Sequence, residues 1–545
     1  MRLSRNIIAA ATMALACQGA VWALDNGGAD AQQRRLESHL RIARDFAANS
    51  DYAGKETFRK AITLAEQVNA NPSSGDKERQ QALEALKKAS KEYLANRPGE
   101  WVRIRNGQMW TDDLGREVQA HGAGFILLND TYYMIGEDRS DKWRPDVNMY
   151  SSKDLKHWKF ENKIIANEKT HPELGSTRMI ERPKLFFNDS TGQFVVWCHW
   201  EARDYSASEA GVFVSDSVAG DYRFHSGGRP LGIKSRDCNI FLDDDGTAYF
   251  ISTIEENTDL GLFRLSDDYL EPVDYTVLFP GDRREAPAIA RKGDRYYMLS
   301  SACTGWDPNP ANLSYTDTLT KGWSPLHKVG NHIAFDTQAA SILKVEGSKD
   351  TTYLYIGDRW QDPNLPESKT IIFPISFTET ECAFNYVPEF DINFATGEWR
   401  PVDPREGMAD RSGWSVIESS GGKAGNPVGN VLDGDITTIW IDEAEAPAKE
   451  GEETIQYFVI DAGQPVAYKG FRATPRSDAG SSEGLVRKYR LETSADGKKW
   501  ATVSEGDWLP YWTDVDTDPE SARYFRFSSL GNPSTSLAEF DLIAQ

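Results

Sequence analysis

Five short stretches between residues 120 and 360 alternate apolar and polar residues, and each one predicts a β-hairpin. In the first, apolar residues run from Phe125 to Leu128, Asn129-Asp130 forms the turn, and a second apolar strand spans Tyr132 to Ile135. This pattern is typical of two paired strands. The same shape recurs in STGQFVVWCHW, DDGTAYFISTI, RKGDRYYMLSSA and SKDTTYLYIGDRW, which begin at residues 190, 244, 291 and 348.

The spacing of these hairpins predicts a five-bladed β-propeller over residues 99–404. The intervals are too irregular for a solenoid and suit four-stranded blades with their loops. An ordinary β-sandwich that contains similar hairpins is the alternative. The second strands of the hairpins begin at Tyr132, Phe194, Tyr249, Tyr296 and Tyr353. The intervals between these positions are 62, 55, 47 and 57 residues.

The segments on either side of the hairpins have different patterns. Residues 24–98 repeat apolar residues at helical spacing, as at Leu36, Leu40 and Ala43, with breaks at Gly54 and at 71–76. This predicts a small bundle of three helices. Residues 405–545 contain short alternating strands, among them QYFVIDAG and ARYFRFSS, and predict an all-β sandwich.

The first 23 residues have a basic start, a short apolar core and small residues before Ala23, which together predict a cleaved signal peptide. Cys17 allows a lipoprotein as the alternative, although Ala14 stands where a lipoprotein signal usually has leucine. No later stretch approaches the roughly 18 apolar residues of a membrane span. We therefore expect a secreted or periplasmic protein.

Net charge and cysteine spacing argue against two classes of function, nucleic-acid binding and metal binding by cysteine. The formal net charge of −22 argues against nucleic-acid binding. The four cysteines beyond Ala23 show no metal-binding spacing, and we expect them to be buried free thiols. They are Cys198, Cys238, Cys303 and Cys382.

Three acidic residues precede hairpins at similar offsets and are the first candidates for chemistry. Glu181, Asp237 and Glu285 would converge on the axis of a propeller. Two or three carboxyl groups around one cavity suit cleavage of a glycosidic bond, because one must be protonated while another stays ionised. Structural ion pairing is the alternative, since an arginine flanks each acid, namely Arg182, Arg236 and Arg284.

At these residues the chain resembles glycoside hydrolase family 43, whose members are five-bladed propellers and inverting enzymes. EAPAIARKGDRYYMLSSA resembles the segment with the general acid, which implies that role for Glu285. DCNIFLDDDGTAYF resembles the segment with the acid that modulates the pKa of the general acid, here Asp237. The usual base of the family, an aspartate, is absent, because Gly122 takes its position.

That absence, with QAHGAG, ERPK, FDTQ and GDRW, resembles the exo-acting β-1,3-galactosidases that trim the galactan backbone of arabinogalactan. The resemblance implies that Gln338 acts as the base and that Glu181 is an acid of the same site. It also implies sugar contacts at His121, Glu137, Glu201, Asn257 and Thr304.

The C-terminal unit resembles the discoidin-like (F5/8 type C) carbohydrate-binding modules of family 32, through NVLDGDITTIW, ATPR and RYFRF. By that resemblance a structural calcium ion is expected at Asp433, Thr438 and Glu539, while catalysis is expected to need no cofactor. The resulting hypothesis is an inverting exo-glycosidase that releases galactose from β-1,3-galactan. An α-L-arabinofuranosidase and an inactive carbohydrate-binding protein are the alternatives.

Overall fold

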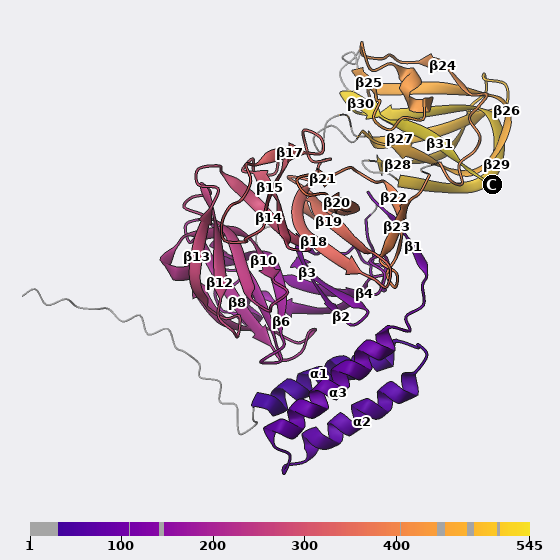
Figure 1. Ribbon diagram of the computed structural model, residues 1–545. Coiled ribbons are helices and arrows are strands. Elements are labelled where there is room, and N and C mark those ends of the chain that lie inside the picture. The colour runs from indigo at the N-terminus through magenta and orange to yellow at the C-terminus, as the bar shows by residue number, and fades with distance from the viewer. Residues whose placement is uncertain are drawn as a thin grey trace, which may run out of the picture.

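The computed structural model describes residues 31–107, 109–140, 146–403, 405–443, 453–476, 484, 486–509 and 513–545. The predicted signal peptide, residues 1–23, and Cys17 lie outside them. Three helices come first, and their apolar faces, with Leu36, Phe58 and Leu83, share one core. The predicted helical bundle is confirmed (Figure 1) and consists of α1 (Ala31–Asn49), α2 (Lys55–Ala70) and α3 (Asp76–Leu94).

Five antiparallel sheets of four strands follow, and each contains its strands in chain order. The first is β2 (His121–Leu128), β3 (Thr131–Glu137), β4 (Val147–Ser152) and β5 (Lys159–Ile165), and the second is β6 (Arg178–Asn188), β7 (Gln193–Ala202), β8 (Glu209–Ser215) and β9 (Arg223–Gly228). The third is β10 (Ser235–Leu242), β11 (Ala248–Ile254), β12 (Asp259–Leu265) and β13 (Pro272–Leu278). The fourth is β14 (Arg284–Lys292), β15 (Arg295–Ala302), β16 (Ala311–Thr316) and β17 (His327–Val329), and the fifth is β18 (Gln338–Glu346), β19 (Thr351–Arg359), β20 (Lys369–Phe377) and β21 (Cys382–Ala383).

These sheets are the blades of a closed ring. The first strand of each blade contacts the first strand of the next, from β2 through β6, β10 and β14 to β18, and β18 returns to β2. Each predicted hairpin forms the first two strands of one blade. The five-bladed propeller is therefore confirmed, and the alternative of a sandwich in this region is wrong.

A small sheet that the sequence did not suggest joins the beginning of this region to its end. It consists of β1 (Trp101–Arg105), β22 (Glu389–Asn393) and β23 (Glu398–Pro401). The remaining short helices are α4 (Asn167–Thr170) and the 3₁₀ turns η1 (Pro230–Gly232), η2 (Leu365–Glu367) and η3 (Val428–Leu432).

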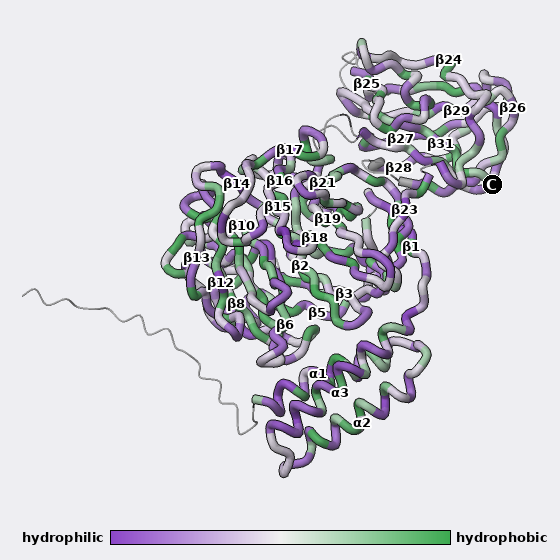
Figure 2. The backbone as a smooth tube through the Cα atoms, in the orientation of Figure 1, coloured by the Kyte–Doolittle hydropathy of each residue, from purple (hydrophilic) through white to green (hydrophobic). Residues whose placement is uncertain are grey.

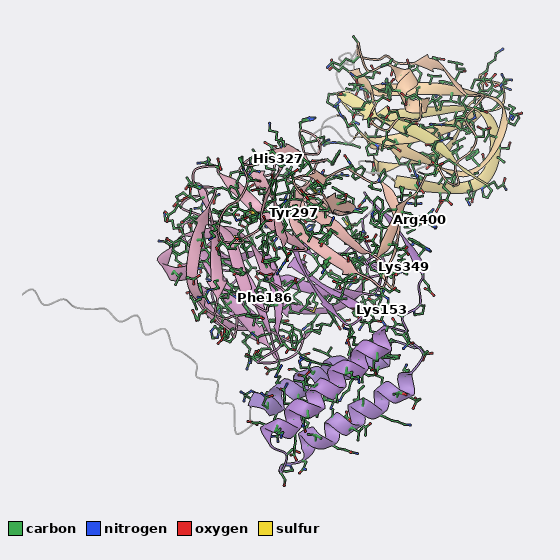
Figure 3. All side chains as sticks on the ribbon, in the orientation of Figure 1. Lys153, Phe186, Tyr297, His327, Lys349 and Arg400 are labelled. Atoms are coloured by element: carbon green, nitrogen blue, oxygen red, sulfur yellow. The ribbon has the colours of Figure 1, made fainter. Side chains whose placement is uncertain are left out.

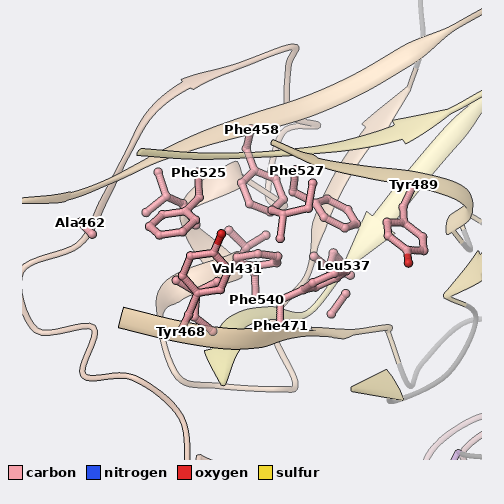
Figure 4. Packing of buried hydrophobic residues seen from close by; sticks show 14 of the residues in the cluster. Val431, Phe458, Ala462, Tyr468, Phe471, Tyr489, Phe525, Phe527, Leu537 and Phe540 are labelled. Carbon is pink, nitrogen blue, oxygen red and sulfur yellow. The ribbon is translucent and has the colours of Figure 1, made fainter. Parts of the chain in front are cut away.

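The last unit is the predicted β-sandwich. One sheet has the order β24-β26-β29-β27-β28 with β31 beside β26, and a second sheet pairs β25 with β30. Phenylalanines such as Phe458, Phe527 and Phe540 fill the space between the strands (Figure 4). The strands are β24 (Ser415–Ser419), β25 (Trp440–Glu443), β26 (Ile455–Thr474), β27 (Val486–Ser494), β28 (Ala501–Leu509), β29 (Thr513–Leu530), β30 (Ser534–Leu537) and β31 (Glu539–Ala544).

The side chains follow the alternation read from the sequence. Apolar and polar stretches interchange along the bundle and along the blades (Figure 2). Cys198, Cys238 and Cys382 are buried free thiols, as expected, whereas the free thiol of Cys303 is partly exposed. No helix among the described residues is long and apolar enough to cross a membrane.

Candidate active site

All five inner strands carry an irregularity at the end where the candidate residues lie. A β-bulge adds a residue to one strand and re-aims the neighbouring side chains. Repeated around the ring, the bulges turn side chains of all five blades toward one end of the axis. They fall between His121 and Gly124, Glu181 and Lys184, Ser235 and Cys238, Glu285 and Ala288, and Ala339 and Ser341.

Polar side chains bind the backbone carbonyl groups near these bulges and join the blades across the axis. The buried Lys184 ammonium donates to the carbonyl of Ala123 at 3.1 Å. The amide of Asn239 donates to the carbonyls of Pro287 at 2.8 Å and Ala340 at 3.0 Å. Because buried backbone groups need partners, these contacts hold the bulges in place.

A cavity of about 340 Å³ opens at this end of the ring. Four predicted catalytic residues line it, so the structure brings together groups that are up to 157 positions apart in the chain. Its walls consist of Glu137, Arg139, Glu181, Arg182, His199, Tyr205, Arg236, Asp237, Asn257, Glu285, Gly305, Trp306, Gln338 and Trp360.

Glu285 has the environment of a proton donor. It begins the bulge of β14, and only 9% of its surface is exposed. Burial raises the pKa of Glu285 to about 8, and the negative charge of Asp237 adds to the shift while Arg182 opposes it. The carboxyl group therefore holds its proton at neutral pH.

Ion pairing, the alternative explanation of the three acids, does not take the predicted form, because none of the flanking arginines pairs with the acid beside it. Glu181 pairs instead with Arg139 and His199. Arg182 Nε lies 2.9 Å from Asp237 Oδ2, which is an ion pair between adjacent blades. Arg284, in contrast, donates to the hydroxyl and carbonyl oxygens of Ser300, so it does not neutralise the neighbouring Glu285.

The side-chain amide of Gln338 makes four hydrogen bonds. Its Nε2 donates to Glu285 Oε1 at 2.9 Å and to Ser301 Oγ at 3.2 Å. Its Oε1 accepts from Arg182 Nη2 and from Trp360 Nε1. Because arginine and tryptophan only donate, the orientation of the amide is fixed, with the nitrogen toward the acid.

Glu181 has the opposite environment to Glu285. Its Oε1 accepts from the Tyr205 hydroxyl at 2.6 Å and from Arg139 at 3.3 Å, and its Oε2 lies 3.0 Å from His199 Nδ1. Burial alone would raise the pKa of Glu181, but contacts with His199, Arg139 and Tyr205 outweigh burial and hold it well below the usual range. Glu181 is therefore ionised.

The five predicted sugar contacts fall into two groups. Glu137 and Asn257 line the cavity. His121 and Glu201 are buried and Thr304 is exposed on a loop, and none of the three is among the residues that line the cavity. His121 contacts Gln119, Glu201 contacts His199, and Thr304 binds the loop at Asp307 and Asn309.

Several lining residues were not singled out from the sequence as site residues. Arg139, His199 and Tyr205 surround Glu181, and Trp306 and Trp360 pack edge to face at 4.9 Å between ring centres. The motifs CTGW and GDRW contain the two tryptophans and were the available signal. His199 stands inside the apolar run FVVWCHW, where nothing distinguishes it from a core residue.

Gly122 leaves no room for the missing aspartate of the family. Its φ of +59° is in the left-handed region, and an added Cβ would lie 2.8 Å from Glu137 Oε1 and 3.1 Å from the Arg182 Cα. The carboxylate of Glu137 on β3 thus takes the space that a side chain on residue 122 would need.

One group in the cavity has the composition of a metal site. Glu181, His199 and Asp237 offer ligand atoms within 4.8 Å of one another. However, Arg139 and Arg182 pair with the two carboxylates, and His199 lies between Glu181 and Glu201. These cations already balance the charge, so the group does not favour a divalent ion.

The residues proposed for calcium adjoin one another in the sandwich. Thr438 Oγ1 donates to Asp433 Oδ2 at 2.7 Å, and Glu539 Oε1 accepts from the backbone of Gly434 at 2.6 Å. These oxygen donors are of the type that calcium prefers. Arg411 already pairs with the other oxygen of Glu539, so two of the roughly four lone-pair directions of this carboxylate are taken. Calcium stays a prediction for this site.

Comparison with known proteins agrees with this geometry. The model for glycosyl hydrolases family 43 matches residues 124–354, and the model for the F5/8 type C domain matches residues 415–540. An exo-β-1,3-galactanase from Clostridium thermocellum is 31% identical, with 65% of this chain and 81% of that chain covered and a TM-score of 0.53. An exo-β-1,3-galactanase from Phanerochaete chrysosporium shares the fold at 22% identity, with coverage of 81% and 99% and a TM-score of 0.60.

A curated relative is more distant. The extracellular exo-α-(1→5)-L-arabinofuranosidase ArbA from Cellvibrio japonicus is 25% identical over 215 residues, which are 34% of this chain and 59% of that protein. The chain thus spans about three fifths of the length of this relative. With the five-bladed propeller, the match of the family model to residues 124–354 and the 31% identity over 81% of the Clostridium thermocellum chain, the chain belongs to glycoside hydrolase family 43.

Proposed function

We propose that this glycoside hydrolase is an exo-acting enzyme that releases galactose from the non-reducing end of β-1,3-galactan with inversion of configuration. The observation that carries the proposal is the contact of the protonated Glu285 with Gln338 in a cavity that lacks the usual aspartate at Gly122. The 31% identity to an exo-β-1,3-galactanase supports galactan as the substrate. We further propose that the protein is exported.

The protonated carboxyl group of Glu285 supplies the proton for the leaving group. In the proposed reaction the glycosidic oxygen takes this proton as the bond to C1 breaks, and a water attacks C1 from the opposite face. Asp237 assists because its negative charge raises the pKa of Glu285. Arg182 pairs with Asp237 and also fixes Gln338, so it links the positions of the two groups.

The attacking water needs a group that orients it and a group that accepts its proton. Gln338 Nε2 lies 2.9 Å from Glu285 Oε1, whereas the two sides of an inverting site usually stand about 6.5–9.5 Å apart. Gln338 can therefore orient the water only when a bound substrate takes over the carboxyl group of Glu285 and separates the two side chains. An imidic form of Gln338 would place a hydrogen on Oε1, where Arg182 and Trp360 already donate. This argues for a role in orientation.

We assign the acceptance of the proton to Glu181. A neutral amide is a poor proton acceptor, whereas Glu181 is an ionised carboxylate on the wall of the same cavity. In the balanced step the oxygen of the water bonds to C1, and its proton passes to Glu181. The proton lost by Glu285 stays on the leaving sugar, and exchange with solvent restores both side chains.

A substrate screen tests the proposal. Purified protein should release galactose from β-1,3-galacto-oligosaccharides and leave aryl α-L-arabinofuranoside intact. Release of arabinose alone would make the protein an arabinofuranosidase, as the similarity to ArbA would suggest. Binding of galactan without release of any sugar would make it a carbohydrate-binding protein.

A further inference from the structure

Behind Glu181 lies a chain of charged groups that has no part in the reaction as described so far. His199 on β7 is 1% exposed, and its ring stands between two carboxylates. Its Nε2 lies 2.9 Å from Glu201 Oε2, and its Nδ1 lies 3.0 Å from Glu181 Oε2. A neutral imidazole has one N–H, so one carboxylate would then face a lone pair. Only the imidazolium form suits both contacts.

Glu201 completes the chain and anchors the loop that follows β7. It is fully buried, and its Oε1 accepts the backbone N–H groups of Ala202 at 2.8 Å, Ala207 at 2.9 Å and Ser208 at 3.1 Å. A buried carboxylate with three such bonds and an imidazolium beside it stays ionised. The charge of Glu201 in turn stabilises the proton on His199.

The anchored loop brings a further donor to Glu181. Tyr205, in left-handed backbone conformation with φ of +57°, donates its hydroxyl to Glu181 Oε1 at 2.6 Å. Arg236 holds the loop from the next blade, through the carbonyl of Tyr205 at 3.0 Å and the hydroxyl of Ser208 at 3.1 Å. The conformation of the loop therefore depends on Glu201 from inside and on Arg236 from outside.

We propose that His199 and Glu201 are positioning residues that keep Glu181 ionised and hold Tyr205 against it, so that Glu181 remains a proton acceptor at acidic pH. This rests on the proposed function of Glu181. The other groups that face Glu181 are Arg139, which favours its ionised form, and Glu137 and Asp237, which oppose it. Contacts with Glu181 and Glu201 outweigh the effect of burial and raise the pKa of His199 to about 9.

The first test needs no substrate. In ¹⁵N-histidine-labelled protein, the His199 signals, identified by their absence in His199→Gln, should show an imidazolium at pH 7.5 and titrate near pH 9. His157→Gln is the matched control, since His157 also pairs with a carboxylate, Asp154, but is 78% exposed. Titration of His199 near its ordinary pKa of about 6.5 would overturn the proposal.

The second test is the pH profile of kcat/KM on β-1,3-galactobiose. His199→Gln should move the acidic limb up by about 1 to 3 pH units, because Glu181 loses a cationic neighbour, and leave the rate at pH 7 within about tenfold of wild type. A loss that is equal at every pH, with an unmoved acidic limb, would mean that His199 is only structural.

Two further readouts distinguish failure of the proposed function from failure of the proposed role of His199 and Glu201. Glu201→Gln should move the same limb in the same direction, and it replaces His199→Gln if that variant does not fold. If the wild type releases no sugar from galactobiose, the proposed function fails, and the histidine titration still decides whether the charged chain exists.

Discussion

At the scale of the residue, the site separates two carboxyl groups by their surroundings. Burial and the charge of Asp237 raise the pKa of Glu285 to about 8. Glu181 is also buried, but contacts with His199, Arg139 and Tyr205 keep its pKa far lower. An acid and a base of opposite protonation at one pH are what inverting hydrolysis needs.

Replacement of the acid should separate substrates by their leaving groups. Glu285→Gln keeps the fold and should lose about 10²–10⁴-fold in turnover on galactan. The loss should be smaller on aryl β-galactosides with good leaving groups, since these need less protonation. Wild-type activity should fall as the pH rises through about 8, where Glu285 loses its proton, and the variant should lack this limb. Equal losses on both substrates would exclude Glu285 as the acid.

The roles of Gln338 and Glu181 lead to distinct kinetics. Gln338→Ala should lower kcat by about 10²-fold or more and leave sugar binding measurable, because an unoriented water attacks slowly. Gln338→Glu should keep some activity with a new acidic limb in its pH profile. Glu181→Gln should abolish most turnover. A near-normal kcat for Gln338→Ala, measured beside binding by calorimetry, would remove the glutamine from the mechanism, and the same result for Glu181→Gln would remove Glu181.

At the scale of the element, the repeated bulge connects the fold to the site. Each inner strand changes register near its functional residue, and Lys184 and Asn239 bind carbonyl groups of other blades. Burial lowers the pKa of Lys184 to about 8, so the charged form of this side chain needs the hydrogen bonds with the carbonyl groups around it. The geometry of the site is therefore set by the closure of the ring.

Gly122 in the first bulge should resist restoration of a side chain. Gly122→Ala should cost about 1–3 kcal/mol of unfolding free energy from strain at positive φ, with an added cost from contact with Glu137 and Arg182. Gly246→Ala is the control, because Gly246 has a φ of +86° and nothing within 4 Å of an added Cβ. Equal losses for the two variants in urea denaturation would show that crowding at Gly122 has no effect.

The sequence predicts the elements better than it predicts their distortions. The alternation of apolar and polar residues predicts all five hairpins, because it continues along both strands of each pair, as in those that contain Tyr132 and Tyr353. The bulges leave no such signal, because contacts between blades fix them. The same holds for the small sheet of β1, β22 and β23, whose strands are far apart in the chain.

Site residues follow a similar division. Glu181, Asp237 and Glu285 could be found because they stand at matching offsets before their hairpins. His199 and Tyr205 could not be found in this way. His199 lies on the strand next to Glu181 and Tyr205 on the loop after it, and their role follows only from their contacts with Glu181 in the folded chain. The resemblance placed Glu201 in contact with sugar, whereas the structure places it behind His199.

At the scale of the whole molecule, the helical bundle and the sandwich lie on different sides of the propeller (Figure 1), and polar contacts join each of them to it. Arg35 of the bundle lies 2.7 Å from Asp189, and Lys153, on the face toward the bundle in Figure 3, binds the carbonyl of Asn49. On the other side, the buried Arg472 of the sandwich lies 3.0 Å from Glu389. These contacts fix both units beside the ring, and neither unit contributes a residue to the lining of the cavity.

Removal of the sandwich should separate binding of polymer from catalysis. Deletion of residues 406–545 should leave activity on galactobiose within about threefold, because no residue of the cavity is lost and Arg105 remains beside Glu389 at 2.6 Å. Activity on insoluble or long galactan should fall more, if the module binds the polymer. Loss of galactobiose cleavage by a truncated protein with an intact circular dichroism spectrum would contradict this division.

The stereochemical course of the reaction tests the central claim most directly. Proton NMR of β-1,3-galactotriose during hydrolysis records which anomer of which sugar appears first. Our account predicts that α-galactose appears before mutarotation, with β-1,3-galactobiose as the other product, since one sugar leaves the non-reducing end with inversion. Initial release of β-galactose, or the absence of galactose while an α-L-arabinofuranoside is cleaved, would contradict it.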